Sequence, residues 1–393
     1  MFESLQTATA DAILALIAQY RDDPRPQKID LGIGVYRTAS GDTPVLGVVK
    51  QAEQILIDEQ SSKAYLGTAG AADFNAAMQA LIFGDVADES RLTTIQTPGG
   101  SGSLRVAAGM LMRAAPNTTV WASEPTWANH VPLLGSAGLE LKSYPYYDSK
   151  NHVLEIAAML EMLRAATPGD VVLLHGCCHN PSGLDPSVDD WAAITDVIVE
   201  KGLIPFIDMA YQGFANGLSE DAHAVRHLLK YVPEMIVSTS CSKNFGLYRD
   251  RVGTLSILSA DAATNSIVDS QVNSLVRTIY SMPPDHGAAV VSLILNDATM
   301  RAEWIAEVAQ MRERLRNMRV LLADALAEKA PGQDFSHLVR ATGMFCFLGL
   351  TAQQISRLKA EFGIYMVDSS RINVAGITVE NVDYLADSIV ATL

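Results

Sequence analysis

Met235-Ile-Val-Ser-Thr-Ser-Cys-Ser-Lys243 is the stretch of this 393-residue sequence that decides the fold class. Its first residues are apolar and partly β-branched, which is typical of a short buried strand, and we expect that strand to end near Ser240. Lys243 then lies just past the carboxyl end of a strand, where open α/β sheets bind their ligands. A lysine there is a candidate amine nucleophile, although a solvated loop lysine is the simpler interpretation of Lys243 taken alone.

Similar apolar runs recur along the middle of the chain and alternate with helical patterns. Val171–His175 precedes a helix expected over Val188–Lys201, and Leu203–Asp208 and Thr254–Ser259 are further strand candidates. Strands that alternate with helices build a mainly parallel sheet covered on both faces. The sequence therefore predicts an α/β fold around such a sheet.

The last quarter of the chain has a different character. Long amphipathic helices follow Pro284, with residues 301–329 the clearest case, and then come short strands at 344–350, 364–367 and 371–374 around a helix at 352–362. A helix is also expected near residues 11–20, where no strand partner is obvious. We expect a small α/β domain made of residues 300–393 and 1–35, including an N-terminal arm, and a large domain over residues 36–299.

Composition narrows the functional classes. The formal net charge of −15 disfavours binding to nucleic acid or to an anionic membrane surface, because both need a basic face. The sequence lacks a secretory signal pattern and an apolar run of about 18 residues, so we expect a cytoplasmic protein. The 4 cysteines form no disulfide framework. A zinc site at Cys177, Cys178, His175 and His179 is a weaker alternative, since no second ligand pair has metal-binding spacing; we predict no metal.

A glycine-rich turn at Thr97-Pro-Gly-Gly-Ser-Gly102 opens a helical pattern. The first N–H groups of a helix lack partners within the helix and attract a phosphate, so Gly100 and Ser101 are candidate contacts. Taken alone the signal is weak, because glycines before a helix usually form only a turn.

Three further segments place polar groups next to strands. Asp208 closes an apolar strand, where its carboxylate needs a cation such as a protonated ring nitrogen, and Tyr211 can present a phenol to the same pocket. A helix N-cap followed by a core tyrosine is an equally good interpretation of that pair. Asn180 can donate its amide to an anionic oxygen. Arg251 and Arg371 suit a carboxylate or phosphate, with structural salt bridges as the alternative.

Taken together, these segments follow the order seen in one family. They are Tyr65-Leu-Gly67, Gly99-Gly-Ser-Gly102, Pro125-Thr-Trp-Ala-Asn-His130, Cys177-Cys-His-Asn-Pro-Ser-Gly183, Asp208-Met-Ala-Tyr-Gln-Gly-Phe214, Ser242-Lys-Asn-Phe-Gly-Leu-Tyr248 and Ser370-Arg-Ile-Asn-Val-Ala-Gly376. The chain resembles the class I aminotransferases over nearly its whole length, in particular the aspartate and aromatic-amino-acid aminotransferases that use pyridoxal 5'-phosphate. The resemblance implies the pyridoxal-phosphate transferase fold type I, with a mainly parallel seven-stranded sheet in a large cofactor-binding domain and a smaller α/β domain.

The resemblance also implies roles around the cofactor. Lys243 would bind pyridoxal phosphate covalently and carry a proton between the substrate α-carbon and the cofactor, while Asp208 would pair with the pyridinium nitrogen. The remaining cofactor contacts would be Asn180 and Tyr211 at the phenolic oxygen, Trp127 stacked on the ring, His130 orienting Asp208, and Gly100, Ser101, Ser240 and Arg251 at the phosphate, joined by Tyr65 of a second subunit.

For the substrate, the resemblance assigns the α-carboxylate to Arg371, with Gly34, Trp127 and Asn180 nearby. Arg277 would reach across a homodimer to the distal carboxylate of aspartate or glutamate. Met282 and Ala64 stand where many aspartate-specific members carry Asn, which favours a larger, more apolar pocket.

We therefore predict an aminotransferase that moves the amino group of aromatic amino acids (Phe, Tyr, Trp) and aspartate to 2-oxoglutarate in a ping-pong cycle. A strictly aspartate-specific aminotransferase is the alternative. A pyridoxal-phosphate-dependent lyase or decarboxylase is more remote, because a clamp for the distal carboxylate at Arg277 suits reversible transfer. A non-enzymatic alternative is an aminotransferase-like domain that serves as an effector sensor, and this function would require a DNA-binding extension.

Overall fold

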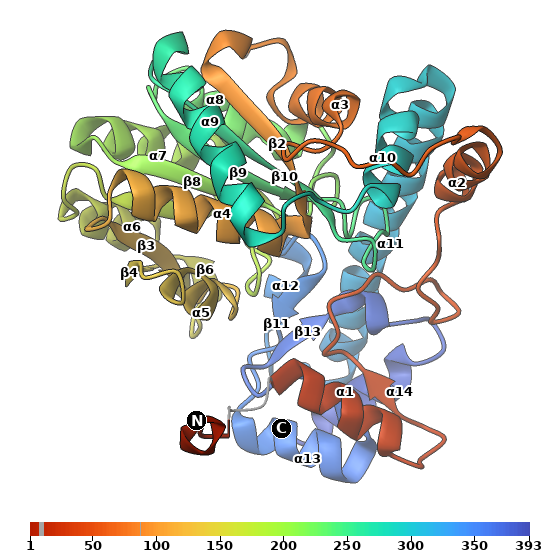
Figure 1. Ribbon diagram of the computed structural model, residues 1–393. Helices are drawn as coiled ribbons and strands as arrows, with labels where there is room; N and C mark the ends of the chain where they lie inside the picture. The colour runs from red at the N-terminus through yellow and green to blue at the C-terminus, as the bar shows by residue number, and fades with distance from the viewer. Residues whose placement is uncertain (8–11, 87) are drawn as a thin grey trace.

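The computed structural model describes residues 1–7, 12–86 and 88–393 and centres on a sheet of seven strands (Figure 1). The prediction of a mainly parallel sheet is confirmed, since only β10 runs antiparallel to its neighbours β2 and β9. From one edge to the other the strands are β2 (Leu92–Pro98), β10 (Val252–Leu258), β9 (Met235–Ser240), β8 (Ile204–Met209), β7 (Val171–His175), β3 (Thr119–Glu124) and β4 (Glu140–Pro145).

The sheet is buried on both faces because alternate residues of its central strands enter two separate cores. Val171 and Leu173 of β7 pack into one core with α4 (Gly99–Ala114) and α9 (Ala262–Ile279). Val172 and Leu174 point to the other core, which includes α7 (Val188–Lys201). This two-sided burial explains why these strands read as continuous apolar runs. The sheet and the helices around it form the larger of two lobes. Its other elements are α2 (Gly47–Glu59), α3 (Ala72–Phe83), α5 (His130–Gly135), β5 (Tyr147–Asp148), β6 (Val153–Leu154), α6 (Ile156–Arg164), α8 (His223–Leu228) and α10 (His286–Asn296).

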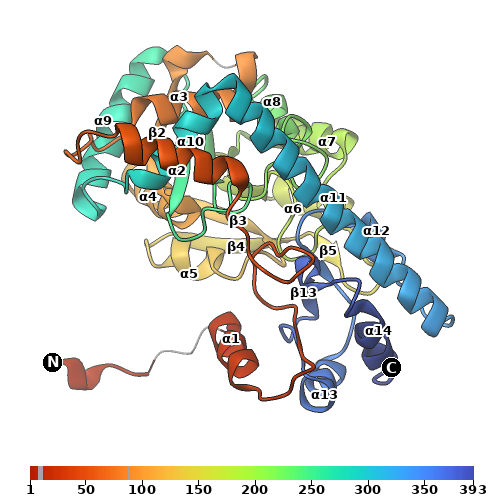
Figure 2. The ribbon, with the colours of Figure 1, turned by 90° about the vertical axis from the view of Figure 1, so that its right-hand side faces the viewer.

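The C-terminal elements form a second, smaller lobe, to which the long helix α11 (Ala298–Lys329) leads (Figures 1 and 2). This lobe contains α12 (His337–Arg340), β11 (Phe345–Phe347), α13 (Ala352–Phe362), β12 (Ile364–Tyr365), β13 (Arg371–Asn373) and α14 (Val382–Val390). The N-terminal segment joins it, because β1 (Ile29–Asp30) pairs in parallel with β12. Sequence reasoning found no partner for this segment because a two-residue strand leaves no periodic signal.

Two helices begin and end where the sequence predicted them, and both have strong caps. Ser187 and Asp190 form a capping box at the start of α7, and Thr351 and Gln354 form one at the start of α13. Each helix ends at a glycine in the left-handed region, which closes the last turn. The helix predicted at residues 11–20 is α1 (Ala12–Asp22), although its predicted first residue, Asp11, and residues 8–10 of the N-terminal arm lie outside the described residues. The domain boundaries at residues 35 and 300 stay predictions.

The described helices also bear on the membrane question and on the cysteines. Within residues 1–7, 12–86 and 88–393, no helix combines the length and the apolar character needed to cross a bilayer. All four cysteines are buried free thiols, as expected of small core residues.

Candidate active site

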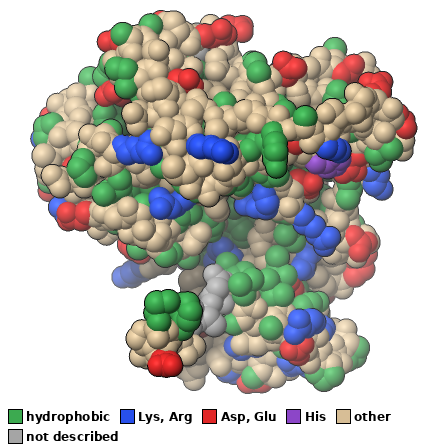
Figure 3. All heavy atoms as spheres, viewed as in Figure 1, with side chains coloured by type: hydrophobic (Ala, Val, Ile, Leu, Met, Phe, Trp, Pro, Cys, Tyr) green, Lys and Arg blue, Asp and Glu red, His purple; other side chains and the backbone are tan. Residues whose placement is uncertain are grey.

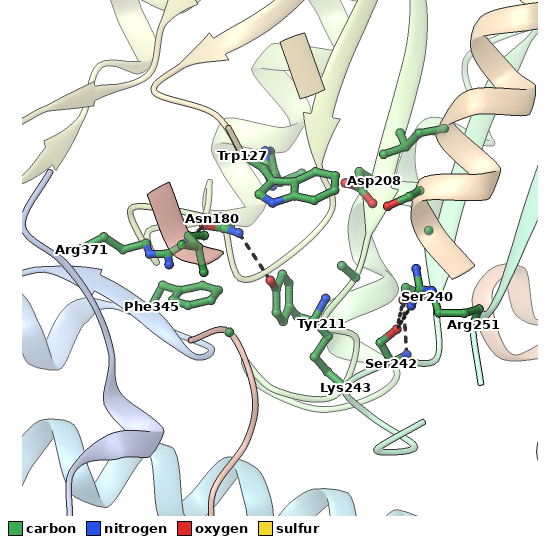
Figure 4. Close-up of a pocket in the computed structure, with 17 residues that line it drawn as sticks. Trp127, Asn180, Asp208, Tyr211, Ser240, Ser242, Lys243, Arg251, Phe345 and Arg371 are labelled. Carbon is green, nitrogen blue, oxygen red and sulfur yellow. Dashed lines mark hydrogen bonds between the residues drawn. The ribbon is translucent and has the colours of Figure 1, made fainter. Parts of the chain in front are cut away.

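A cavity of about 220 Å³ lies at the carboxyl ends of the central strands. In the space-filling view the surface is hollowed between the two lobes, with Lys and Arg side chains along the upper rim (Figure 3). Most of the predicted site residues line the cavity (Figure 4): Gly34, Gly100, Ser101, Trp127, Asn180, Asp208, Tyr211, Ser240, Lys243, Arg251 and Arg371.

One end of the cavity is a cluster of hydrogen-bond donors at the start of α4. Gly99 has φ +70°, and a Cβ atom there would lie 2.7 Å from Nη2 of Arg251. A Cβ atom at Gly100 would lie 3.3 Å from Cβ of Ser240, so both glycines allow the backbone to approach closely. Arg251 itself adopts φ 56° and donates from Nη1 to Oγ of Ser242 over 3.3 Å. Free helix N–H groups beside hydroxyls and a guanidinium make an anion-binding site.

Asp208, at the end of β8, supplies the negative charge of the cavity. Its Oδ2 lies 2.9 Å from Nε2 of His130, whose Nδ1 lies 2.9 Å from Oγ1 of Thr126. Burial alone would raise the pKa of Asp208, but the hydrogen bond from His130 and the charges of His130, His175 and Lys243 outweigh it, so this pKa lies below its usual value. Asp208 is therefore a buried carboxylate kept ionised and ready for a cationic partner.

Lys243 and Tyr211 lie in the middle of the cavity, between its anion-binding end and Arg371 (Figure 4). Nζ of Lys243 is 4.7 Å from the centroid of the Tyr211 ring. Burial, opposed by the charge of Asp208 and aided by that of Arg251, lowers the pKa of Lys243 to about 8. A substantial share of this amine is neutral near that pH and is thus nucleophilic. Nδ2 of Asn180 donates to the Tyr211 hydroxyl over 3.5 Å, and burial raises the pKa of that phenol.

Arg371 begins β13 in the small lobe and points into the cavity from the side opposite Arg251 (Figure 4). Its Nη2 donates to the carbonyl of Gly32 over 2.8 Å and its Nη1 to Oδ1 of Asn180 over 3.3 Å. The guanidinium lies 4.3 Å from the centroid of the Phe345 ring, and its buried Nε has no hydrogen-bond partner among the residues that the structure describes. An Nε with unused donor capacity suits a carboxylate ligand.

Three predicted site residues, Tyr65, Arg277 and His130, do not line this cavity. Tyr65 is 94% exposed and Arg277 lies on an exposed part of α9. The resemblance assigns both to the site of a second subunit, which stays a prediction. Sδ of Met282 lies 2.9 Å from the N–H of Leu66, so Met282 is next to the segment that contains Ala64 and Tyr65. His130 lies behind Asp208 and is fully buried.

Comparisons with known proteins decide the family. The sequence model of the family "Aminotransferase class I and II" matches residues 26–389. The chain belongs to this family. It is 47% identical to the aspartate aminotransferase of Escherichia coli over 100% of both chains, and 44% identical to the aromatic-amino-acid aminotransferase of Pseudomonas aeruginosa over 99% of this chain and 98% of the relative. A crystal structure of the aromatic-amino-acid aminotransferase from Burkholderia pseudomallei, covalently bound to pyridoxal phosphate, superposes with a TM-score of 0.98 at 39% identity, covering 100% of this chain and 99% of that one.

Pyridoxal phosphate is the cofactor of the aminotransferase family, and the donors in this cavity fit it. The anion-binding end at α4 can hold the phosphate, and the amine of Lys243 can bond to the aldehyde carbon. The ionised Asp208 can pair with a protonated ring nitrogen. The glycines at 99 and 100 leave the space that a Cβ atom would fill.

Sequence reasoning missed several residues of this aminotransferase site. Ser242, His175 and Phe345 line the cavity, and Thr126 joins His130 to His175. The Ser240-Cys-Ser242 spacing was a signal for Ser242, since both hydroxyls follow the same strand end. The sequence contains no comparable signal for Phe345, because this residue reaches the cavity only through packing between the lobes.

For the zinc alternative, the cluster of possible metal ligands in the structure differs from the four residues that the sequence suggested. Among the described residues, Cys177, Cys178 and Asp221 have ligand atoms within 4.8 Å of one another. The Asp221 carboxylate already accepts N–H groups from residues 213, 215, 216 and 217. The absence of a metal stays a prediction.

Proposed function

We propose that this chain catalyses the reversible transfer of an amino group from aromatic amino acids or aspartate to 2-oxoglutarate. The observation that supports this most directly is one cavity holding a partly neutral lysine, a buried ionised carboxylate, an anion-binding helix start and a buried arginine. The relatives named for aspartate and for aromatic substrates are almost equally similar to the chain, which supports a dual substrate range.

The phosphate and ring of the cofactor would be held from two sides. Gly100, Ser101, Ser240 and Arg251 bind the phosphate, and Trp127 packs on the ring. Pyridoxal phosphate, when bound, accepts the electrons released when the substrate α-C–H bond breaks. Asp208 keeps a proton on the ring nitrogen through its negative charge, and His130 fixes the orientation of that carboxylate.

Lys243 would be both the covalent anchor and the proton carrier. Once the substrate amine has displaced it from the cofactor, the Lys243 amine would be free and, with its low pKa, partly neutral, so it would take up the proton from the substrate α-carbon and hold it for return. Asn180 and Tyr211 stabilise negative charge on the phenolic oxygen of the ring. The Tyr211 ring also borders the path of the lysine amine, 4.7 Å from Nζ.

Arg371 would bind the substrate α-carboxylate beside Gly34 and Asn180, which orients the α-C–H bond toward Lys243. Arg277 of a second subunit would take a distal carboxylate, and Tyr65 of that subunit would reach the phosphate. We therefore propose a homodimer with shared sites, working on amino acids and 2-oxo acids in the cytoplasm.

The test is a transamination assay on the purified protein loaded with pyridoxal phosphate. Aspartate, phenylalanine, tyrosine and tryptophan are each offered with 2-oxoglutarate, and glutamate formation is measured. We expect turnover with aspartate and with the aromatic substrates. Turnover with aspartate alone would establish the strictly aspartate-specific alternative, and release of CO₂ or of a side-chain fragment without glutamate would overturn the proposal.

A further inference from the structure

Arg319 is a buried arginine of α11 that lies outside the cavity. It is 2% exposed, and its Nη2 donates to the carbonyl oxygens of Thr342, Gly343 and Phe345 over 2.9, 2.8 and 2.8 Å. Within the described part of the chain, its buried Nη1 has no hydrogen-bond partner. A buried guanidinium is costly unless it is hydrogen-bonded, so Arg319 holds these three carbonyls in a fixed arrangement around it.

The three carbonyls belong to one turn, residues 342–345, which leads into β11. The turn is shaped by Gly343 at φ +68°, where a Cβ atom would lie 2.5 Å from Cβ of Cys178. It is also tied to the loop that follows β7: the N–H of Thr342 donates to the carbonyl of Gly183 over 2.6 Å, and its hydroxyl donates to Asp185 over 2.8 Å. Arg319 therefore anchors to α11 a turn of the small lobe, and Thr342 ties that turn to the loop that contains Asn180.

The turn ends at Phe345, whose ring lies in the cavity. A Cβ atom at Gly34 would be 3.2 Å from its Cζ, and the ring meets Tyr211 edge-on at 6.0 Å. On its face lies the Arg371 guanidinium at 4.3 Å. The guanidinium is held by the carbonyl of Gly32 at 2.8 Å and by a longer 3.3 Å bond to Asn180, so the ring beneath it is a further support that helps to set its orientation.

We propose that Arg319 is a positioning residue for carboxylate recognition: through the 342–345 turn it sets the Phe345 ring, and the ring sets the Arg371 guanidinium. Because it concerns how Arg371 binds substrate, this inference rests on the proposed function. Arg319 touches neither the cofactor nor the substrate. Its effect falls on binding of the carboxylate and leaves the phosphate end unaffected.

The experiment compares Arg319→Met, Arg319→Lys and Phe345→Leu, alone and as the double variant with Arg319→Met, in the cofactor-loaded protein. The dissociation constants of two non-reactive acids, maleate and 3-phenylpropionate, are measured by titrating the cofactor absorbance, and that of pyridoxal phosphate by equilibrium dialysis. Arg312→Met is the matched control, since Arg312 is also on α11 and donates to a backbone carbonyl, that of Gly213, over 3.0 Å.

We expect Arg319→Met to weaken both acids by roughly 2- to 30-fold, the range typical of residues that act through others, with unchanged affinity for pyridoxal phosphate. Arg319→Lys restores part of the affinity, and Arg312→Met leaves it unchanged. The double variant loses little more than Phe345→Leu alone, because both changes act on one ring. Additive losses would overturn the proposal, as would equal loss of acid and cofactor affinity or wild-type acid binding in Arg319→Met. Failure of the wild-type protein to transaminate would instead concern the proposed function.

If Arg319→Met does not fold, Arg319→Lys, alone and combined with Phe345→Leu, provides the same double-mutant comparison. Thermal unfolding of each variant, measured in parallel, separates a general loss of stability from a change confined to acid binding.

Discussion

Nε2 of His130 lies 2.9 Å from Oδ2 of Asp208, and this contact joins a fully buried imidazole to the carboxylate at the end of β8. The carboxylate lies in the cavity and the imidazole behind it, so the two residues have unequal tasks. Asp208 provides the negative charge, and His130 fixes the orientation of the carboxylate that carries it.

That division predicts unequal losses on substitution. Asp208→Ala should reduce the transamination rate by about 10²–10³-fold or more, since a preorganised charge at the reacting group is lost. His130→Ala should reduce it far less, because the Asp208 carboxylate remains in the cavity and loses only its hydrogen-bond partner. Steady-state kcat for aspartate measures both, with His337→Ala as a control for loss of a buried histidine outside the cavity. Equal losses in the two variants would contradict this account.

The low pKa of Lys243 predicts a pH dependence of folding in the cofactor-free protein. The folded-state pKa of about 8 lies below the ordinary lysine value of 10.5, so between these values the unfolded chain binds more protons. Lys243 therefore makes the free energy of unfolding rise with pH across this window.

Urea unfolding of the wild type and of Lys243→Met at pH 8 and pH 10 measures this effect. The difference in stability between the two proteins should shift toward the wild type at the higher pH. Other groups, including tyrosines with raised pKa values, cancel in that difference. A difference that does not change with pH would show that Lys243 is an ordinary solvated lysine.

The exposure of Tyr65 and Arg277 in the single chain predicts complementation between subunits. A hybrid dimer of Lys243→Ala and Arg277→Ala subunits has one site with both changes and one with neither. Each variant alone should be nearly inactive with aspartate, while subunits exchanged at equal amounts should regain about a quarter of wild-type activity, because about half of the dimers are hybrids with one intact site. No recovery, despite hybrid dimers seen by mass spectrometry, would place Arg277 and Lys243 in the same subunit's site.

Met282 predicts how the substrate range is set. Its sulfur lies 2.9 Å from the N–H of Leu66, a contact that the side-chain oxygen of Asn can also make. Met282→Asn should therefore fold normally and raise the ratio of kcat/KM for aspartate to that for phenylalanine by roughly tenfold, as the pocket becomes more polar. Met162→Asn, at a 39% exposed methionine of α6, is the control. An unchanged ratio would exclude Met282 as a specificity residue.

The sequence revealed the parts of the molecule that local chemistry determines. The strand that ends near Asp208 is mostly apolar, the strand before Lys243 begins with an apolar run, and capping boxes mark the starts of α7 and α13. The roles of Arg371 and Asn180 came from a resemblance between motifs, because neither residue indicates by itself that the two will lie 3.3 Å apart. Phe345 and Arg319 were beyond reach, since their contacts join segments far apart in the chain.

Arg251 combines a left-handed backbone, φ 56°, with a guanidinium at the anion-binding end of the cavity. A residue with a Cβ atom is strained in that conformation by about 1 kcal/mol relative to glycine. Arg251→Gly should therefore give a cofactor-free protein with a higher melting temperature and a weaker hold on pyridoxal phosphate. A directed-evolution campaign that selects for heat resistance alone would tend to remove this arginine, so thermostability and cofactor retention have to be selected together.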